Sequence, residues 1–320
     1  MDTLDVEKLK EKLEESYLRV KDEACNSFSR YFQKTFGESL LAVILYGSCL
    51  SEKTRSPTSI YDFYLLVDSY WGFYRNKLHA LLNYFLPPNS YNLKTTDEDQ
   101  NPLLCKYCVI SLKSLKKETS PVAKDIYHFG RFAKRVGIIW VKNEQIKQEL
   151  LDCLLNAIRT NILYVVPTLP DDFILKDFII QALSLSYQGE TRIEKENKIE
   201  EFYGAEKEFY TWIYGTLLDH HLDQHSLIKD PAGTYRFRQE VPQRESGRKR
   251  TEGFLKKSRR RFISRWPKHI FTYRDYIDYL LAKVERSRGI KIELTPIERR
   301  FPLIFGWKHF YRLKRKGMIK

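Results

Sequence analysis

The sequence lacks any long hydrophobic run. Its longest apolar stretches, such as Leu40–Tyr46, fall far short of the roughly 20 residues with which a helix crosses a bilayer. We therefore expect no membrane-spanning helix. The stretch Met1–Glu15 also lacks an apolar block and has more acidic than basic residues. We expect neither a secretory signal nor an Arg-rich transit peptide there.

Cysteine is scarce as well, with five residues in a chain of 320. An odd number of cysteines favours reduced thiols in a cytosol-like compartment over a disulfide framework. Cys105 and Cys108 form a lone C-x-x-C pair on an expected strand, which predicts neither zinc binding nor redox chemistry. The histidines of His220-His221-x-Asp223-x-His225 also invite a metal assignment. Neighbouring helix residues point about 100° apart, however, so we expect a surface helix end there.

The excess of positive charge is confined to one part of the chain. Residues 244–320 contain 24 Lys and Arg against 7 Asp and Glu, whereas residues 1–243 contain 31 against 34. Such a region suits a polyanionic surface, either lipid or nucleic acid. We expect its last stretch, residues 303–320, to form a basic amphipathic helix that associates with a membrane. The alternative is a final helix that packs Trp307 and Phe310 onto the catalytic domain.

A Gly-Ser turn between two apolar stretches is the most informative pattern that is present. Leu40–Tyr46 is typical of a strand that ends at Gly47-Ser48, and the next apolar stretch carries Asp62 near its start. A strand ending in Gly-Ser can present backbone N–H groups to a phosphate. An acid on the neighbouring strand can hold the Mg²⁺ that accompanies a triphosphate. The pairing resembles the nucleotidyltransferase superfamily, except that Tyr64 replaces the usual second acid; the plain alternative is a β-hairpin core.

The spacing of apolar residues predicts the remaining elements. The expected helices are 5–36, 72–85, 125–130, 144–163, 170–184, 198–222 and 273–286. The expected further strands are 104–111 and 136–141, and the expected polar loop is 89–102. Strands and helices together, followed by helices alone, predict an α/β (α+β) protein in which a mixed-sheet domain precedes a mainly helical one.

These elements divide the chain into four expected parts. They are a nucleotidyltransferase-like catalytic domain at 1–143, a helical domain at 144–225, a basic polar linker or mobile loop at 226–265 and a basic C-terminal region at 266–320. A winged-helix-like arrangement is one option for the helical domain.

Several short motifs, kept in order and spacing, suggest a family. They are Tyr46-Gly47-Ser48, Asp62-Phe63, Lys106-Tyr107, Val109-Ile110-Ser111, Ile126-Tyr127, Gly130-Arg131, Lys134, Leu185-Ser186-Tyr187, Gly189 and Arg192. In these the chain resembles the mitochondrial translocator assembly and maintenance family, whose members are peripheral-membrane CDP-diacylglycerol synthases. The resemblance covers residues 40–195, and the last quarter shares only its basic, amphipathic character.

The resemblance implies a set of site residues. Asp62 and Lys106 would be catalytic, and Asp62 would also bind the metal ion. Glu190, which stands where the family commonly has Asp, is the candidate second metal ligand. The candidate CTP-binding residues are Gly47, Ser48, Tyr91, Arg131, Lys134 and Arg192.

The implied reaction transfers CMP from CTP to phosphatidate and uses Mg²⁺ or another divalent cation. The lipid phosphate attacks the α-phosphorus of CTP, so no protein nucleophile is required. We expect a peripheral enzyme on an anionic membrane, either on the cytoplasmic face of a bacterial cell membrane or, for a processed chain, on the matrix side of the mitochondrial inner membrane. Two alternatives stay open: a nucleotidyltransferase that acts on RNA or protein, and a non-catalytic anion-binding module with the same fold.

Overall fold

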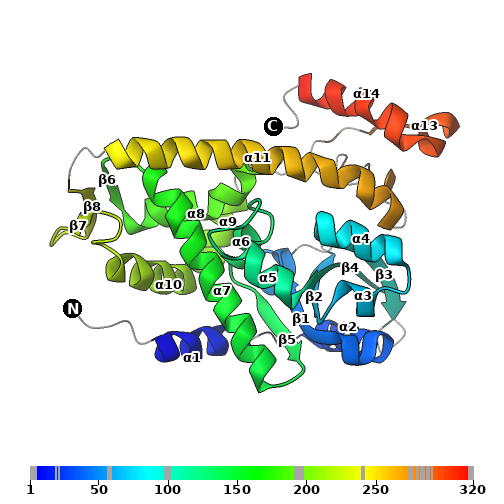
Figure 1. Cartoon of the computed structure of the whole chain (residues 1–320), viewed down its shortest axis with the longest axis horizontal. Coiled ribbons are helices and arrows are strands. Elements are labelled where there is room, and N and C mark those ends of the chain that lie inside the picture. Colours follow the sequence, from blue (N-terminus) through cyan, green and yellow to red (C-terminus); the bar gives the residue numbers. More distant parts are fainter. Residues whose placement is uncertain are drawn as a thin grey trace.

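The computed structural model is a mixed α/β protein (Figure 1). It describes residues 6–18, 20, 22–55, 60–96, 102–190, 198–238, 242–272 and 291–315, and single positions at 277–278, 281, 285 and 289. The longer described helices are α1 (Val6–Tyr17), α2 (Glu23–Phe36), α4 (Lys77–Phe85), α5 (Leu112–Glu118), α7 (Glu144–Val165), α8 (Leu175–Gln188), α9 (Lys198–Ala205), α10 (Lys207–His220), α11 (Pro242–Thr272) and α14 (Pro302–Arg315). The short ones are α3 (Tyr70–Phe73), α6 (Phe129–Phe132) and α13 (Pro296–Arg300).

A five-stranded sheet forms the centre of the fold. Its strands are β1 (Leu40–Tyr46), β2 (Tyr61–Val67), β3 (Asn89–Thr96), β4 (Pro102–Ser111) and β5 (Gly137–Val141), and their order is β3-β4-β2-β1-β5. Strands β2 and β4 run parallel, and the other neighbours are antiparallel. In this register Asp62 lies opposite Tyr46 on one side and Lys106 on the other. Strand pairing therefore brings together residues that are far apart in the sequence.

Alternate side chains of the sheet enter two different cores, as the period of two along a strand requires. On one face, Val43, Phe63 and Leu65 pack with Phe28 and Phe32 of α2, Tyr70 of α3 and Ala80 of α4. On the other face, Ile44, Tyr64 and Ile110 pack with Phe132 of α6, Leu154 of α7 and Leu183 of α8. Asp62 has the same parity as Tyr64, so its side chain belongs to the α6–α8 face.

The helix predicted over residues 5–36 is two helices, α1 and α2. Asp22 breaks the run because its backbone is extended and its carboxylate accepts a hydrogen bond from the Ala24 N–H at 2.9 Å, which caps α2. Apolar spacing continues across the break, since both helices bury one side. The periodicity of the sequence therefore did not reveal the cap.

The prediction of a polar loop over residues 89–102 is wrong for the first part of this range, which forms β3. This strand pairs with β4 from Asn89 opposite Val109 to Thr96 opposite Pro102. It is an edge strand, and an edge strand with one solvated side needs few apolar residues. Its polar composition therefore concealed it.

In its described parts, 226–238 and 242–265, the segment predicted as a linker or mobile loop forms two strands and most of a helix. Strands β7 (Leu227–Lys229) and β8 (Thr234–Phe237) join β6 (Asp172–Ile174) in a small antiparallel sheet of order β6-β8-β7. The helix α11 follows, and in Figure 1 it runs across the picture above α8, α9 and α4 and below α14 and α13. Its buried positions include Thr251, Leu255, Ser258, Arg265, Lys268, His269 and Thr272. These positions have helical spacing. Because most of them are polar, the sequence shows no apolar periodicity there, and the helix was not predicted.

Two other helices bear on the sequence-based expectations. The segment Glu144–Thr168, which contains α7, is long and apolar enough to cross a membrane, but 72% of the relevant window is buried inside the protein. A core helix of a soluble protein passes the same test, and α7 lines the main core. The expected C-terminal helix is present as α14 over Pro302–Arg315, while residues 316–320 lie outside the described residues.

Candidate active site

Gly47 ends β1 in a conformation that only glycine adopts readily. Its φ is +87°, and a Cβ at this position would lie 3.3 Å from Oδ2 of Asp62. Ser48 then begins a single 3₁₀ turn, Ser48–Leu50. The Gly-Ser turn predicted from the sequence therefore lies directly against the predicted catalytic acid.

Asp62 and Lys106 form an ion pair at this end of the sheet. The Lys106 ammonium lies 3.2 Å from Oδ1 of Asp62, and the two side chains are 22% and 30% exposed. The parallel pairing of β2 with β4 places them on the same face. Partial exposure leaves both groups able to reach a ligand.

The residue that replaces the second acid, Tyr64, is a core residue. It is fully buried, its ring lies 4.9 Å from that of Tyr46, and its hydroxyl lies 3.4 Å from Nδ1 of His128. It fills the space beside the sheet end with aromatic packing. Asp62 is therefore the acid that β2 itself supplies here.

Glu190 is paired with Arg131. The Arg131 guanidinium donates from both terminal nitrogens to the two carboxylate oxygens of Glu190, and the longer bond measures 3.1 Å. Glu190 is almost entirely buried, with a side chain 1% exposed. Arg131 also lies 3.6 Å from the centre of the Tyr127 ring. Because both Glu190 oxygens accept hydrogen bonds from one guanidinium, the geometry favours a role in orienting Arg131 over the predicted role as a metal ligand.

Two other predicted binding residues have different surroundings. The Lys134 ammonium donates to the Ser186 hydroxyl at 2.9 Å and lies over the Tyr187 ring, which anchors it to the end of α8. Tyr91 lies opposite Tyr107, so it shares the α2–α4 face and points away from Lys106. Tyr91 therefore lies on the other face of the sheet from Asp62 and Lys106, and its predicted role in binding CTP stays a prediction. Arg192 lies outside the described residues.

Helix α11 supplies basic residues that the sequence analysis missed. Arg265 donates to Oδ2 of Asp125 at 2.8 Å and to the Pro87 carbonyl at 2.8 Å, and Arg261 donates to the same Asp125 oxygen at 2.7 Å. Lys268 donates to the carbonyls of Leu86 and Pro88. These bonds fix the last turns of α11 against two segments, the loop between α4 and β3 and the loop between α5 and α6 that contains Asp125.

The charge of Lys106 acts on His269, near the end of α11. Burial lowers the pKa of His269 well below its ordinary value, and the charges of Lys268 and Lys106 lower it further. Burial, followed by the charge of Arg265, likewise lowers the pKa of Lys268. Basic groups that repel one another around a partly dry site are suited to an anionic ligand. The sequence does contain a signal for these residues: Arg261, Arg265 and Lys268 follow one another at helical spacing, which places them on one side of a helix.

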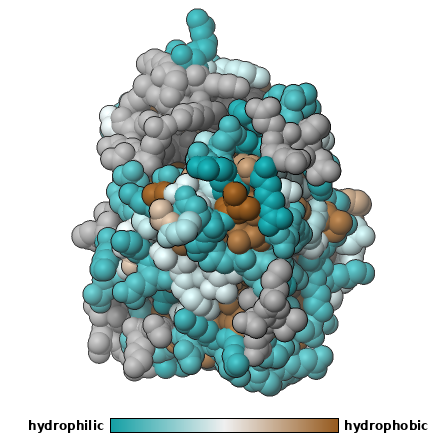
Figure 2. Space-filling model, turned by 90° about the vertical axis from the view of Figure 1, so that its left-hand side faces the viewer, coloured by the Kyte–Doolittle hydropathy of each residue, from teal (hydrophilic) through white to brown (hydrophobic). Residues whose placement is uncertain are grey.

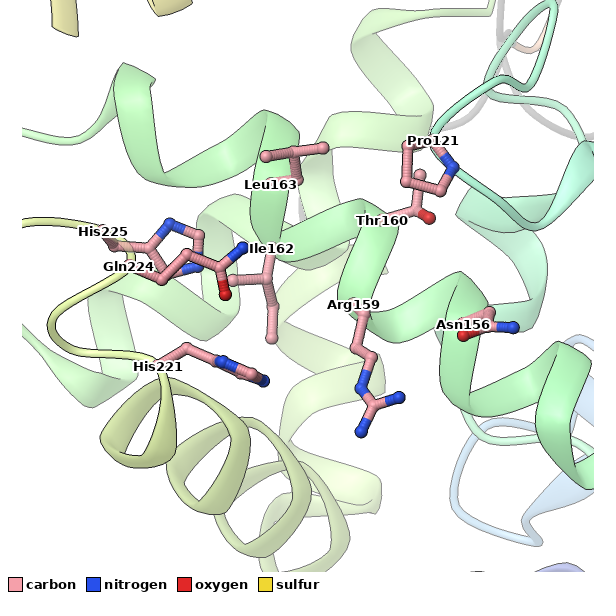
Figure 3. A pocket seen from close by; sticks show the side chains of 9 residues that line it. All are labelled: Pro121, Asn156, Arg159, Thr160, Ile162, Leu163, His221, Gln224 and His225. Atoms are coloured by element: carbon pink, nitrogen blue, oxygen red, sulfur yellow. The ribbon is translucent and has the colours of Figure 1, made fainter. Parts of the chain in front are cut away.

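The histidine-rich segment lies elsewhere, around a cavity of about 400 Å³ (Figure 3). His221 and His225 line it from the end of α10, and Arg159 enters it from α7. Burial lowers the pKa of both histidines, and the charge of Arg159 contributes to the shift at His221. Within the described ranges, no three His, Cys, Asp or Glu side chains are grouped to hold a metal ion. The positive charge of Arg159 in the same lining also disfavours a metal cation, because like charges repel.

The buried His128 makes stability depend on pH. Burial, then the charge of Arg265, lowers its pKa from 6.5 to about 3, so the folded protein keeps this imidazole neutral. The unfolded state binds more protons between these values, and stability therefore falls as the pH falls below 6.5. We expect His128 to lower the free energy of unfolding by about 2 kcal/mol when the pH falls from 6.5 to 5. Urea unfolding at the two pH values measures this change.

The matched variant for this prediction is His128→Gln, which cannot gain a proton. Its pH dependence should be flatter than that of the wild type, and equal slopes would contradict the assignment. Asp125 does not interfere, because burial raises its pKa but Arg265 and Arg261 bring it down to about 2, below the window tested.

A comparison with known families identifies the chain. Residues 88–289, which are more than half of it, match the family model described as mitochondrial phosphatidate cytidylyltransferase. No curated protein matches the chain. The matched range includes Lys106, Arg131, Lys134, Glu190 and all of α11, whereas Gly47, Ser48 and Asp62 precede it.

The match makes the chain a nucleotidyltransferase. More particularly, it belongs to the mitochondrial phosphatidate cytidylyltransferase family, which confirms the resemblance seen in the sequence. The enzyme makes CDP-diacylglycerol, with CTP and phosphatidate as its substrates. The alternatives of an RNA- or protein-modifying enzyme and of a non-catalytic module are thereby set aside.

Proposed function

We propose that the sheet end around Asp62 is the site of cytidylyl transfer. The proposal rests on one observation. The Gly47 turn lies against the Asp62 carboxylate, and this carboxylate forms an ion pair with Lys106 on the neighbouring strand. This arrangement supports a nucleotidyltransferase-like sheet. Backbone N–H groups after β1 would bind phosphate, and Lys106 would stabilise the charge that develops on the triphosphate.

We assign phosphate binding to basic side chains near this end of the sheet. Arg131, held by Glu190, is oriented before any ligand binds, so its guanidinium loses little freedom when it contacts a phosphate. Lys134 lies on the same short segment, against α8. We assign phosphate binding to Arg131 and Lys134, and the positioning of Arg131 to Glu190. The lipid phosphate is the nucleophile, and pyrophosphate is the leaving group.

Asp62 is suited to a hard divalent cation such as Mg²⁺. Magnesium in nucleotide enzymes is commonly bound by one or two carboxylates together with substrate phosphates and water. A single partly exposed carboxylate beside a phosphate-binding turn fits this pattern. When bound, the ion would neutralise charge on the triphosphate.

Membrane association completes the proposal. Helix α14 is basic, and its Ile304 and Tyr311 are 68% and 61% exposed. Each basic residue near an anionic lipid surface contributes about 1 kcal/mol to binding. We propose a peripheral enzyme on an anionic membrane, the mitochondrial inner membrane being the setting that the family description supports. The catalytic domain would comprise residues 1–143 together with the docked end of α11, and residues 144–225 would form the helical domain.

The test is pyrophosphate release from CTP in the presence of phosphatidate vesicles. Release should require phosphatidate, and RNA should not replace the lipid. Chelation with EDTA should lower the rate by about a hundredfold or more, and excess Mg²⁺ should restore it. A rate that EDTA leaves unchanged would contradict the metal assignment, with a Mg²⁺-loaded chelator as the control.

A further inference from the structure

Helix α4 exposes its large apolar side chains. The exposed fractions are 55% for Leu78, 41% for Leu81, 60% for Tyr84 and 62% for Phe85. Spacings of three, four and seven residues place these side chains on one side of the helix. A surface helix of a soluble protein ordinarily turns such a side inward.

The buried side of α4 is small and polar, and it holds the helix firmly. Ala80 and Asn83 are fully buried. The Asn83 amide donates to the Tyr74 hydroxyl at 3.0 Å and to the Val109 carbonyl at 2.9 Å, and its oxygen accepts from the Asn89 N–H at 2.7 Å. Buried amide bonds of this kind are costly to break. The orientation of α4 is therefore fixed, and its apolar side faces outward.

The segment that carries this apolar side contains basic residues and no acidic ones. Residues 69–96 contain no Asp or Glu, and their basic residues Arg75, Lys77 and Lys94 are exposed. Trp71 of the adjacent α3 is 48% exposed. Trp and Tyr favour the boundary between hydrocarbon and water, and basic residues favour anionic lipid headgroups.

The apolar side is joined to the docked end of α11 through one short loop. The chain leaves α4 at Leu86, and the carbonyls of Leu86, Pro87 and Pro88 accept hydrogen bonds from Lys268 and Arg265. Figure 1 shows α4 next to the same end of α11. One end of this loop is continuous with the exposed helix, and its carbonyls accept hydrogen bonds from Arg265 and Lys268 of α11.

We propose that Trp71, Leu78, Leu81, Tyr84 and Phe85, together the α4 face, insert into the surface of an anionic bilayer. Phosphatidate keeps its acyl chains in the bilayer, so its phosphate reaches the active site only if the site lies at the membrane. The exposed basic residues Arg75, Lys77 and Lys94 and the interfacial aromatic residues Trp71 and Tyr84 favour a lipid surface over a second copy or a protein partner. The inference rests on the phosphatidate substrate and is independent of the roles proposed for Asp62 and α14.

The experiment compares two double variants of the full-length protein. Leu78→Ser with Phe85→Ser removes the centre of the α4 face. Ile174→Ser with Ile228→Ser is the matched control, since these residues are 47% and 43% exposed on the small sheet β6-β8-β7. That sheet lies at the other end of the molecule, where Figure 2 shows a mainly hydrophilic surface.

Co-sedimentation with phosphatidylcholine vesicles containing phosphatidate measures binding. The α4 variant should bind vesicles roughly tenfold more weakly, and the control should bind as the wild type does. Turnover of vesicle phosphatidate should fall with binding, while turnover of dispersed short-chain phosphatidate should be retained. In the wild type, lipids brominated on their acyl chains should quench Trp fluorescence, and Trp71→Phe should lose part of this quenching.

Three results would overturn the proposal. The first is vesicle binding and turnover by the α4 variant equal to those of the wild type. The second is an equal loss of turnover on vesicle and dispersed substrate, which would indicate a damaged active site. The third is a wild-type dimer that the α4 substitutions convert to a monomer, which would make this face an interface between two copies. Failure of the Asp62 proposal would leave vesicle binding unaffected, so the two failures are distinguishable.

Discussion

Asp62→Asn should reduce CTP-dependent pyrophosphate release by about a hundredfold or more while the protein stays folded. The amide keeps the size of the side chain but removes the anionic oxygen that a hard cation requires. The stability cost should be about 1 kcal/mol or less, because the ion pair with Lys106 is partly exposed. Initial rates on phosphatidate vesicles and thermal unfolding measure the two quantities.

Asp68→Asn is the matched control for this prediction. Asp68 follows the same strand, is exposed and lies six residues further on, which is about 20 Å along an extended chain. The control should keep nearly all of its activity. If Asp62→Asn turns over CTP at a tenth of the wild-type rate, the reacting phosphates lie elsewhere.

Arg265→Met should lower the free energy of unfolding by about 3 kcal/mol or more. Arg265 is 2% exposed, and it neutralises the fully buried Asp125. Removal of one partner of a buried ion pair leaves a charge without its counterion in a dry environment. Arg261 still contacts Asp125, which limits the loss but does not replace the bond from Arg265 to the Pro87 carbonyl. Urea unfolding measures the effect.

The controls for this prediction separate the ion pair from helix propensity. Arg260→Met changes an exposed residue of the same helix and should cost less than about 0.5 kcal/mol. Asp125→Asn combined with Arg265→Met should destabilise less than the sum of the two single changes, because the pair acts as a unit. Additive effects, or a cost equal to that of Arg260→Met, would show that this pair does not hold α11 in place.

The docking of α11 changes what the basic C-terminal quarter means. Its charges suggested a solvated linker and a polyanionic partner outside the protein. Several of them instead contact the chain itself, where Arg261 and Arg265 meet Asp125 and Lys268 meets backbone carbonyls. The end of α11 is thus docked onto the chain, and the described basic residues of α14 that are exposed are Lys308, Arg312 and Arg315.

The sequence by itself determined those parts of the site that strand periodicity and turn chemistry control. Two apolar runs, a Gly-Ser turn and an acid near the start of the second run placed Gly47 beside Asp62, because adjacent strands and a glycine-specific φ leave few alternatives. The ordered motifs then indicated the family. The expectation that Lys106 belongs to this site is consistent with its ion pair with Asp62.

Only the tertiary structure decided the contacts that depend on distant segments. Glu190 pairs with Arg131, and Tyr91 faces away from Lys106, because packing and strand register set these neighbours. The buried stripe of α11 is polar, and the exposed side of α4 is apolar, so hydrophobic periodicity alone could not orient either helix. Buried polar side chains such as Asn83 and Arg265 fix both helices, since an unpaired polar group in a dry interior costs more than an exposed apolar one.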